Sequence, residues 1–118
     1  MPPIINYENK TVVVTGAATG VGAVLLDRLR DAHAERVIAL DVKPCNGPID
    51  DFILTDLSDP FAIDDAIHRL PESIDVLFNN AGVASTLPIP VVMGVNVLAP
   101  RRLIAGIRHR MPPGSAVV

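Results

Sequence analysis

Aromatic residues and cysteine are scarce in this chain of 118 residues, which has no tryptophan, one tyrosine, three phenylalanines and a single cysteine, Cys45. Hydrophobic residues nevertheless make up 49% of the sequence, so any core must consist of aliphatic side chains, as in parallel sheets covered on both faces. This composition excludes a disordered chain, and one cysteine excludes an intrachain disulfide and agrees with a reducing compartment. We therefore expect one α/β domain of ordinary size in the cytoplasm.

Long apolar runs and a targeting signal are also missing. No uninterrupted apolar run reaches the roughly 18 residues of a membrane span, so no membrane contact is expected. His33 and His68 lack partners at metal-ligand spacing, so no metal site is expected either.

Acidic residues are absent from the last third of the chain. The net charge is −3, but no acidic residue follows Asp75, and four arginines cluster between Arg101 and Arg110. Because no aromatic residues are interleaved with these arginines, a solvated helix face, or an acidic partner in a part of the protein outside these residues, is favoured over nucleic acid.

One stretch, from Thr15 to Gly22, organises the rest of the chain. It follows an apolar β-branched run typical of a buried strand, and it precedes apolar residues that recur at helical spacing. The stretch is therefore predicted to be a strand-to-helix turn. Such a turn brings the backbone close to a pyrophosphate and directs a helix N-terminus at it, although glycines also occur in ordinary tight turns. The predicted dinucleotide contacts are Gly16, Thr19, Gly20, Val21 and Gly22.

The spacing of these glycines, T-G-x-x-x-G-x-G, resembles the classical branch of the short-chain dehydrogenase/reductase family. The extended branch of that family, which contains the sugar-nucleotide epimerases, usually has the spacing T-G-x-x-G-x-x-G. The glycine turn therefore disfavours an epimerase.

An acid, Asp41, ends the second expected strand (residues 36–40), 19 positions after Gly22. At that place a carboxylate accepts hydrogen bonds from an adenosine ribose and repels a 2′-phosphate. Ala17, where relatives that prefer NADP often carry a basic residue, also favours NAD over NADP, whereas Lys43 is a weaker signal in the opposite direction. The alternative is that Asp41 is a plain acid in a strand-end turn.

Two further motifs follow the third and fourth expected strands (residues 52–54 and 75–78). In the resembled family an Asp-Leu or Asp-Val pair contacts the adenine ring, and Asp56-Leu57 matches it; a surface turn acid is the alternative. The string Asn79-Asn80-Ala81-Gly82 matches the family's N-N-A-G signature, whose first Asn braces the sheet. The resemblance thus implies cofactor contacts by Asn80, Ala81 and Gly82.

Asp59-Pro60 predicts the start of a helix, with Asp as the N-cap and Pro at the first helical position. We expect its inward side chains to be Phe61, Ile63, Ala66, Ile67 and Leu70.

Asn96 matches the family's catalytic Asn; the alternative is a buried Asn satisfied within a helix. Only 13 residues separate it from Gly82, and this short connection resembles the bacterial 3α-hydroxysteroid dehydrogenase/carbonyl reductase subgroup. The family resemblance implies a helix from about Val91 to Met111. Pro100 inside that helix cannot donate to the carbonyl of Asn96, which is then free to hold a water. Alternatively, Pro100 begins a second helix.

The expected fold is a Rossmann-type doubly wound α/β parallel sheet of order 3-2-1-4 plus a partial fifth strand at residues 115–118, incomplete at the C-terminus. Residues 1–118 are expected to form one NAD-binding domain. The family's catalytic Ser and Tyr-x-x-x-Lys have no counterpart in these residues, so we expect this polypeptide alone to be inactive and poorly soluble.

The resemblance implies that the complete protein transfers hydride between NAD and a small-molecule alcohol/ketone pair. By analogy with the subgroup, the substrate would be a steroid or another hydrophobic carbonyl compound. It also implies a homo-oligomer, either dimer or tetramer. The alternatives are a non-catalytic NAD-binding sensor or scaffold module, and a natural short form.

Overall fold

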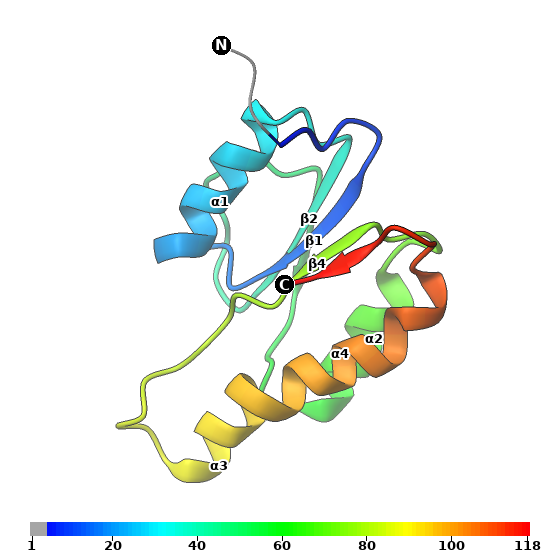
Figure 1. Ribbon diagram of the computed structural model, residues 1–118. Helices are drawn as coiled ribbons and strands as arrows, with labels where there is room; N and C mark the ends of the chain where they lie inside the picture. The colour runs from blue at the N-terminus through cyan, green and yellow to red at the C-terminus, as the bar shows by residue number, and fades with distance from the viewer. Residues whose placement is uncertain (1–4) are drawn as a thin grey trace.

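Five parallel strands form a single sheet in the order β3-β2-β1-β4-β5 in the computed structural model, which describes residues 5–118 (Figure 1). The strands are β1 Thr11–Thr15, β2 Arg36–Asp41, β3 Asp51–Leu54, β4 Val76–Phe78 and β5 Ala116–Val117. This order confirms the predicted Rossmann-type sheet, including a short fifth strand beside β4. Because the chain leaves β1 first toward β2 and later returns to β4 on its other side, a crevice opens above the carboxyl end of β1.

Helices cover both faces of the sheet. They are α1 Gly20–Asp31, α2 Pro60–Arg69, α3 Ile89–Met93, the π-helical turn η1 Gly94–Leu98, α4 Ala99–Ile107 and the 3₁₀ turn η2 Arg108–Arg110. In Figure 1, α1 lies on one face, and α2 and α4 lie side by side on the other. Val12 and Val14 belong to the core under α1, whereas Val13 belongs to the core under α2 and α4. The two-residue period of β1 thus supplies both cores.

The apolar residues at helical spacing predict a first helix from about Val21 to Ala34, but α1 ends at Asp31. His33 adopts a left-handed conformation with φ of 66°, and the amide of Ala34 donates to the carbonyl of Leu29 at 3.0 Å. This arrangement is a common way to end a helix, although Gly is the residue that usually adopts it. Between β2 and β3 the chain forms a loop instead of a helix, and Cys45 and Ile49 of this loop pack against the α1 side of the core.

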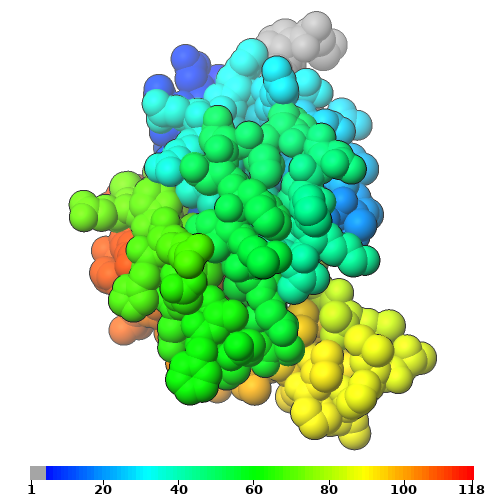
Figure 2. Space-filling view, turned by 180° about the vertical axis from the view of Figure 1, so that it is seen from behind, coloured from blue at the N-terminus to red at the C-terminus, as the bar shows by residue number. Residues whose placement is uncertain are grey.

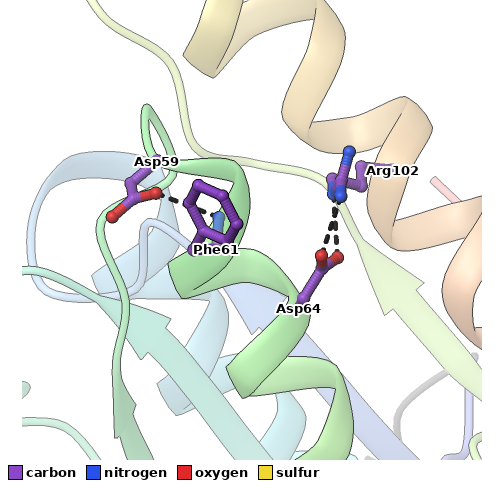
Figure 3. A network of polar contacts seen from close by, with 4 residues as sticks. All are labelled: Asp59, Phe61, Asp64 and Arg102. Carbon is purple, nitrogen blue, oxygen red and sulfur yellow. Dashed lines mark hydrogen bonds and ion pairs between the residues drawn. The ribbon is translucent and has the colours of Figure 1, made fainter.

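The predicted start of α2 is confirmed. The Asp59 carboxylate accepts a hydrogen bond of 2.9 Å from the amide of Phe61, and Pro60 is the first helical residue (Figure 3). The inward position predicted for Phe61 is wrong, because its side chain is 84% exposed. Ile63 and Ile67 define the buried face, and Phe61 lies two residues, or about 200°, away from Ile63 around the helix.

Residues Ile89–Arg110 form one helical stretch of 22 residues that, by length and composition alone, could cross a membrane. The family resemblance predicted a helix from about Val91 to Met111 here, but the sequence indicated no segment that could cross a membrane. Two arginines of this stretch contact α2, and four residues spaced four apart bury one face in the core: Val95, Ala99, Leu103 and Ile107. In this fold the stretch is therefore packed as a helix of the α/β domain.

Candidate cofactor-binding site

A cleft of about 570 Å³ lies along the carboxyl ends of the strands. It contains residues from all four predicted motifs, which lie at the carboxyl ends of β1, β2, β3 and β4 or directly after them. The predicted cofactor residues that line it are Gly16, Thr19, Val21, Asp41, Asp56, Leu57, Asn80, Ala81 and Gly82. Gly20 and Gly22 lie in the same turn but do not line the cleft.

The glycine turn packs directly on the segment after β4, and this contact leaves no room for side chains. A Cβ on Gly16, which has φ of 67°, would lie 2.7 Å from the Cα of Ala81. A Cβ on Gly22 would lie 2.6 Å from Nδ2 of Asn80 and would also collide with the carbonyl oxygen of Gly16. Both glycines are therefore required by the close approach of two backbone segments.

Hydrogen bonds hold these two segments in register. The Asn80 amide nitrogen donates to the carbonyl of Gly16 at 3.0 Å, and the buried hydroxyl of Thr15 accepts from the amide of Ala81 at 3.0 Å. Next to them, the backbone amide of Asn79 donates to the carbonyl of Val118 at 2.8 Å, which joins the ends of β4 and β5. Oδ1 of Asn79 is buried without a partner among the described residues.

Asp41 is held by two backbone amides at the edge of the cleft. Its Oδ2 accepts from Ala18 in the glycine turn, and its Oδ1 accepts from Lys43, both at 3.0 Å. A carboxylate has about four lone-pair sites, so two remain for further donors. The carboxylate is thus fixed in place and still able to accept hydroxyl groups.

Asp56 forms a local turn at the next strand end. Its Oδ1 accepts from the hydroxyl of Ser58 at 2.6 Å and from the amide of Ser58 at 2.9 Å. The hydrogen bond from the hydroxyl, followed by that from the amide, lowers the pKa of Asp56 below its usual value, so the group is a carboxylate near neutral pH. Leu57 beside it is buried and forms part of the cleft wall.

Asn96 lies in η1, and its side chain is satisfied outside the helix. Its Oδ1 accepts from the amide of Val83 at 2.8 Å, and its Nδ2 donates to the carbonyl of Val83 at 3.1 Å. The alternative of a buried Asn satisfied within a helix is wrong, because Asn96 is exposed and bonds to the segment after β4. Its side chain does not line the cleft, but it fixes Val83, which does.

The helix continues on both sides of Asn96, so the alternative in which Pro100 begins a second helix is wrong. The hydrogen-bond ladder is shifted there, because the amide of Ala99 donates to Gly94, five residues back. The Ala99 amide is used by Gly94 and Pro100 has no N–H, so no free amide stands four or five residues ahead of the carbonyl of Val95. The carbonyl of Asn96 likewise has no donor four residues ahead, where Pro100 stands.

Other titratable groups do not add a reactive centre to this site. Burial, followed by the charge of Asp41, raises the pKa of the Cys45 thiol, which therefore stays protonated at neutral pH. Within residues 5–118, no group of three or more His, Cys, Asp or Glu residues is placed to hold a metal ion.

Comparison with known proteins identifies the family. Residues 12–116 match the model of the NAD dependent epimerase/dehydratase family. The chain belongs to this family. Its named relatives and solved neighbours further show that it is an N-terminal segment of the short-chain dehydrogenase/reductase family. The matched model includes epimerases, which the glycine spacing disfavours, whereas the relatives described next are dehydrogenases.

Coniferyl-alcohol dehydrogenase from Pseudomonas sp. strain HR199 is 41% identical over 97% of this chain and 44% of its own length. Uronate dehydrogenase from Pseudomonas syringae pv. tomato is 33% identical over 73% of this chain and 30% of its own length. The crystal structure of a short-chain dehydrogenase/reductase from Brucella ovis, in complex with a partially ordered NAD, is 31% identical with a TM-score of 0.71. That match covers 87% of this chain and 58% of the other. The chain thus spans less than half the length of these two curated relatives.

The sequence did not predict several of the residues that line the cleft. They are Leu40, Val42, Lys43, Thr55, Ser58, Val83, Val91 and Val95. Val83 directly follows the N-N-A-G signature, and Val91 and Val95 are spaced four apart on one helix face, so spacing could have identified them. Val42 directly follows Asp41 and gave no chemical signal, whereas Lys43 was interpreted only as a weak signal for NADP.

Proposed function

We propose that this chain is the cofactor-binding part of an NAD-dependent oxidoreductase of the classical short-chain dehydrogenase branch, which interconverts an alcohol and a ketone or aldehyde. The observation that carries the proposal is the convergence of four strand-end motifs on one cleft. The two curated relatives are both named dehydrogenases, which supports the same reaction type.

The residues of the cleft fit a dinucleotide. The N-terminus of α1 and the close-packed glycine turn suit a pyrophosphate, the fixed carboxylate of Asp41 suits a ribose, and Leu57 offers an apolar surface for adenine. The nicotinamide supplies the hydride acceptor or donor when it is bound. Asn96 holds the segment that starts at Val83, and its carbonyl is the proposed water site.

Asp41 favours NAD over NADP in this proposal, because a 2′-phosphate would lie beside a carboxylate. The acid–base pair of the reaction is expected outside these residues, since Tyr7 is the only tyrosine and no Lys stands four residues after it.

The short connection between Gly82 and Asn96 supports placement in the 3α-hydroxysteroid dehydrogenase/carbonyl reductase subgroup. We also propose that the complete protein forms a homo-oligomer in the cytoplasm. The names of the two relatives give two substrate chemistries, an uncharged aromatic alcohol and a sugar acid that carries a carboxylate.

The test is binding and turnover with the full-length protein. We expect NADH to bind, seen as a change in its fluorescence, and secondary or primary alcohols to reduce NAD. Absence of NADH binding would contradict the proposal. Binding of NADH without turnover of any alcohol would favour the alternative, an NAD-binding sensor or scaffold.

A further inference from the structure

We infer that the loop after Val83 together with helix α3, residues 84–93, forms an arm that swings outward to admit the dinucleotide and closes against it; this rests on the proposed function. The arm leaves the segment after β4 and returns to the fold at Gly94, the first residue of η1. In Figure 2 it belongs to the yellow lobe that projects from the body of the molecule.

Few contacts hold the arm to the rest of the protein, and none of its residues is buried. The hydrogen bonds at its turns stay inside it, from the Leu87 amide to the carbonyl of Ala84 at 3.1 Å and from the Val91 amide to that of Pro88 at 3.0 Å. Within residues 5–118, Val91 is the one arm residue that packs against the core under α2 and α4. Segments with so few buried apolar contacts open at a low cost in free energy.

The base of the arm, by contrast, is fixed. Asn96 pairs with both backbone groups of Val83, at 2.8 and 3.1 Å, so the two ends of the arm stay side by side. Val95 is 8% exposed and packs in the core with Ala99. The arm therefore moves as a flap about a closed base, while Asn96 and Val83 remain in place.

The helical hydrogen bonding is least regular between the arm and α4. The π turn interrupts the ladder there, and the carbonyls of Val95 and Asn96 have no free amide four residues ahead. Helices bend at irregularities of this kind. Because the double hydrogen bond from Arg102 to Asp64 holds α4 to α2, bending displaces α3 and leaves α4 on the sheet.

The arm closes the cleft by bridging the edge of the sheet. Val91 lines the cleft together with Val83 and Val95 at the base, and so does Ser58 in the turn after β3. A Cβ on Gly94 would lie 3.7 Å from the Cα and 4.0 Å from the Cβ of Ser58, so the end of the arm touches this turn. Because β2 and β1 lie between β3 and β4, the chain from Val83 to Gly94 crosses the edge along which the cleft runs. A dinucleotide bound there enters and leaves when the arm moves away.

A disulfide across the contact between Ser58 and Gly94 tests the inference in the full-length protein. The 4.0 Å between their Cβ positions lies within the usual range of about 3.5–4.5 Å for a disulfide. The double variant Ser58→Cys/Gly94→Cys, once oxidised, therefore holds the arm against the turn after β3. We expect NADH to associate and dissociate slower by about tenfold or more in the oxidised than in the reduced protein, measured by stopped-flow fluorescence. Both rates fall together, so the affinity changes much less than either rate.

The single variants Ser58→Cys and Gly94→Cys, treated with the same oxidant, are the matched controls, because neither can form this bridge. Each should keep the rates that it has when reduced. Peptide mass spectrometry identifies the bridge and shows whether the native Cys45 takes part in it.

Hydrogen exchange of the wild-type full-length protein is a second measurement that needs no disulfide. Without cofactor, we expect the amides of Val92 and Met93 in the arm to exchange faster, by about tenfold or more, than those of Leu103 and Ile104 in α4. NADH should slow the exchange of the two arm amides.

Two outcomes overturn the inference: equal NADH rates in the oxidised and reduced double variant, or arm amides that are as protected as those of α4 before NADH is added. Arm amides whose exchange NADH does not change overturn it as well. If oxidation leaves the two cysteines unpaired, hydrogen exchange decides alone. Failure of NADH to bind the wild-type protein would instead overturn the proposed function.

Discussion

The glycine turn and the segment after β4 can pack together only because Gly22 has no Cβ. The Cβ of an alanine at position 22 would lie 2.6 Å from Nδ2 of Asn80, and it would also touch the carbonyl that Asn80 binds. We therefore expect Gly22→Ala to separate the two segments and to weaken NADH binding by at least tenfold, measured by fluorescence titration of the full-length protein.

The control for this variant is Gly94→Ala. A Cβ there would have its nearest neighbour at 3.7 Å, which is ordinary van der Waals contact. Equal loss of NADH affinity in the two variants would contradict the steric explanation.

Asp41 is the residue that we expect to select between the two nicotinamide cofactors. Asp41→Ala removes the charge that would face a 2′-phosphate, so the preference for NADH over NADPH should narrow by about 1–3 kcal/mol, the scale of a charged hydrogen bond. Because Ala18 also loses its acceptor, NADH binding itself should weaken. Dissociation constants of both cofactors for both proteins test this expectation, and equal affinities of the wild-type protein for NADH and NADPH would refute it.

Helices and strands were predictable where side-chain pattern alone determines them. The β-branched run of β1 and the Asp59-Pro60 start of α2 are local signals, and both are confirmed. Phe61 was misplaced because its hydrophobicity was given more weight than its angular position. The end of α1 was missed because a histidine occupies a left-handed position that glycine usually takes.

The site was predictable where a motif requires a backbone contact. The motifs identified the cleft, because glycines and small residues are needed wherever two chain segments approach closely. The π turn at Gly94–Leu98 was not predictable, since it depends on how the ladder adjusts to Pro100 and on the pairing of Asn96 with Val83. That pairing is a tertiary contact between residues 13 positions apart.

At the scale of the helices, replacing Pro100 tests whether the irregular hydrogen bonding around Asn96 contributes to catalysis. Pro100→Ala supplies an N–H that can donate to Val95 or Asn96, and alanine favours a helix interior over proline by up to about 3 kcal/mol. We expect unchanged or higher thermal stability together with a lower kcat in the full-length enzyme, because the carbonyl of Asn96 becomes occupied. Thermal unfolding and alcohol oxidation measure the two effects.

Pro60→Ala is the matched control, because Pro60 occupies the first helical position, where no N–H is needed. It should leave kcat unchanged. An unchanged kcat in Pro100→Ala would show that the proline has no part in catalysis.

At the scale of the whole molecule, the late arginines join the two helices that cover one face of the sheet. Arg102 of α4 binds both carboxylate oxygens of Asp64 in α2, at 2.8 and 2.7 Å (Figure 3). Arg110 donates to the carbonyls of Ile67 and Leu70 at the end of α2, at 2.7 and 3.2 Å. Two of the four arginines that suggested an acidic partner thus have their partner within this chain, which favours neither nucleic acid nor a separate protein.

The Asp64–Arg102 pair gives the packing of these helices a pH dependence. The hydrogen bond from Arg102 lowers the pKa of Asp64 in the folded protein. A group with a lowered pKa stabilises the fold above its ordinary pKa of about 4, and this contribution is lost as the pH falls through the lowered value. Arg102→Met removes the partner, so the variant should be less stable than the wild type at neutral pH, and the difference should shrink as the solution becomes acidic. Because the pair is exposed, the difference should also be small and should decrease with added salt. Urea unfolding of both proteins between neutral pH and about pH 3 measures it.

Arg69→Met, which breaks a pair within α2, separates the effect of joining two helices from that of losing a surface charge. A stability difference between Arg102→Met and wild type that stays constant over this pH range would show that the ion pair does not hold α2 and α4 together.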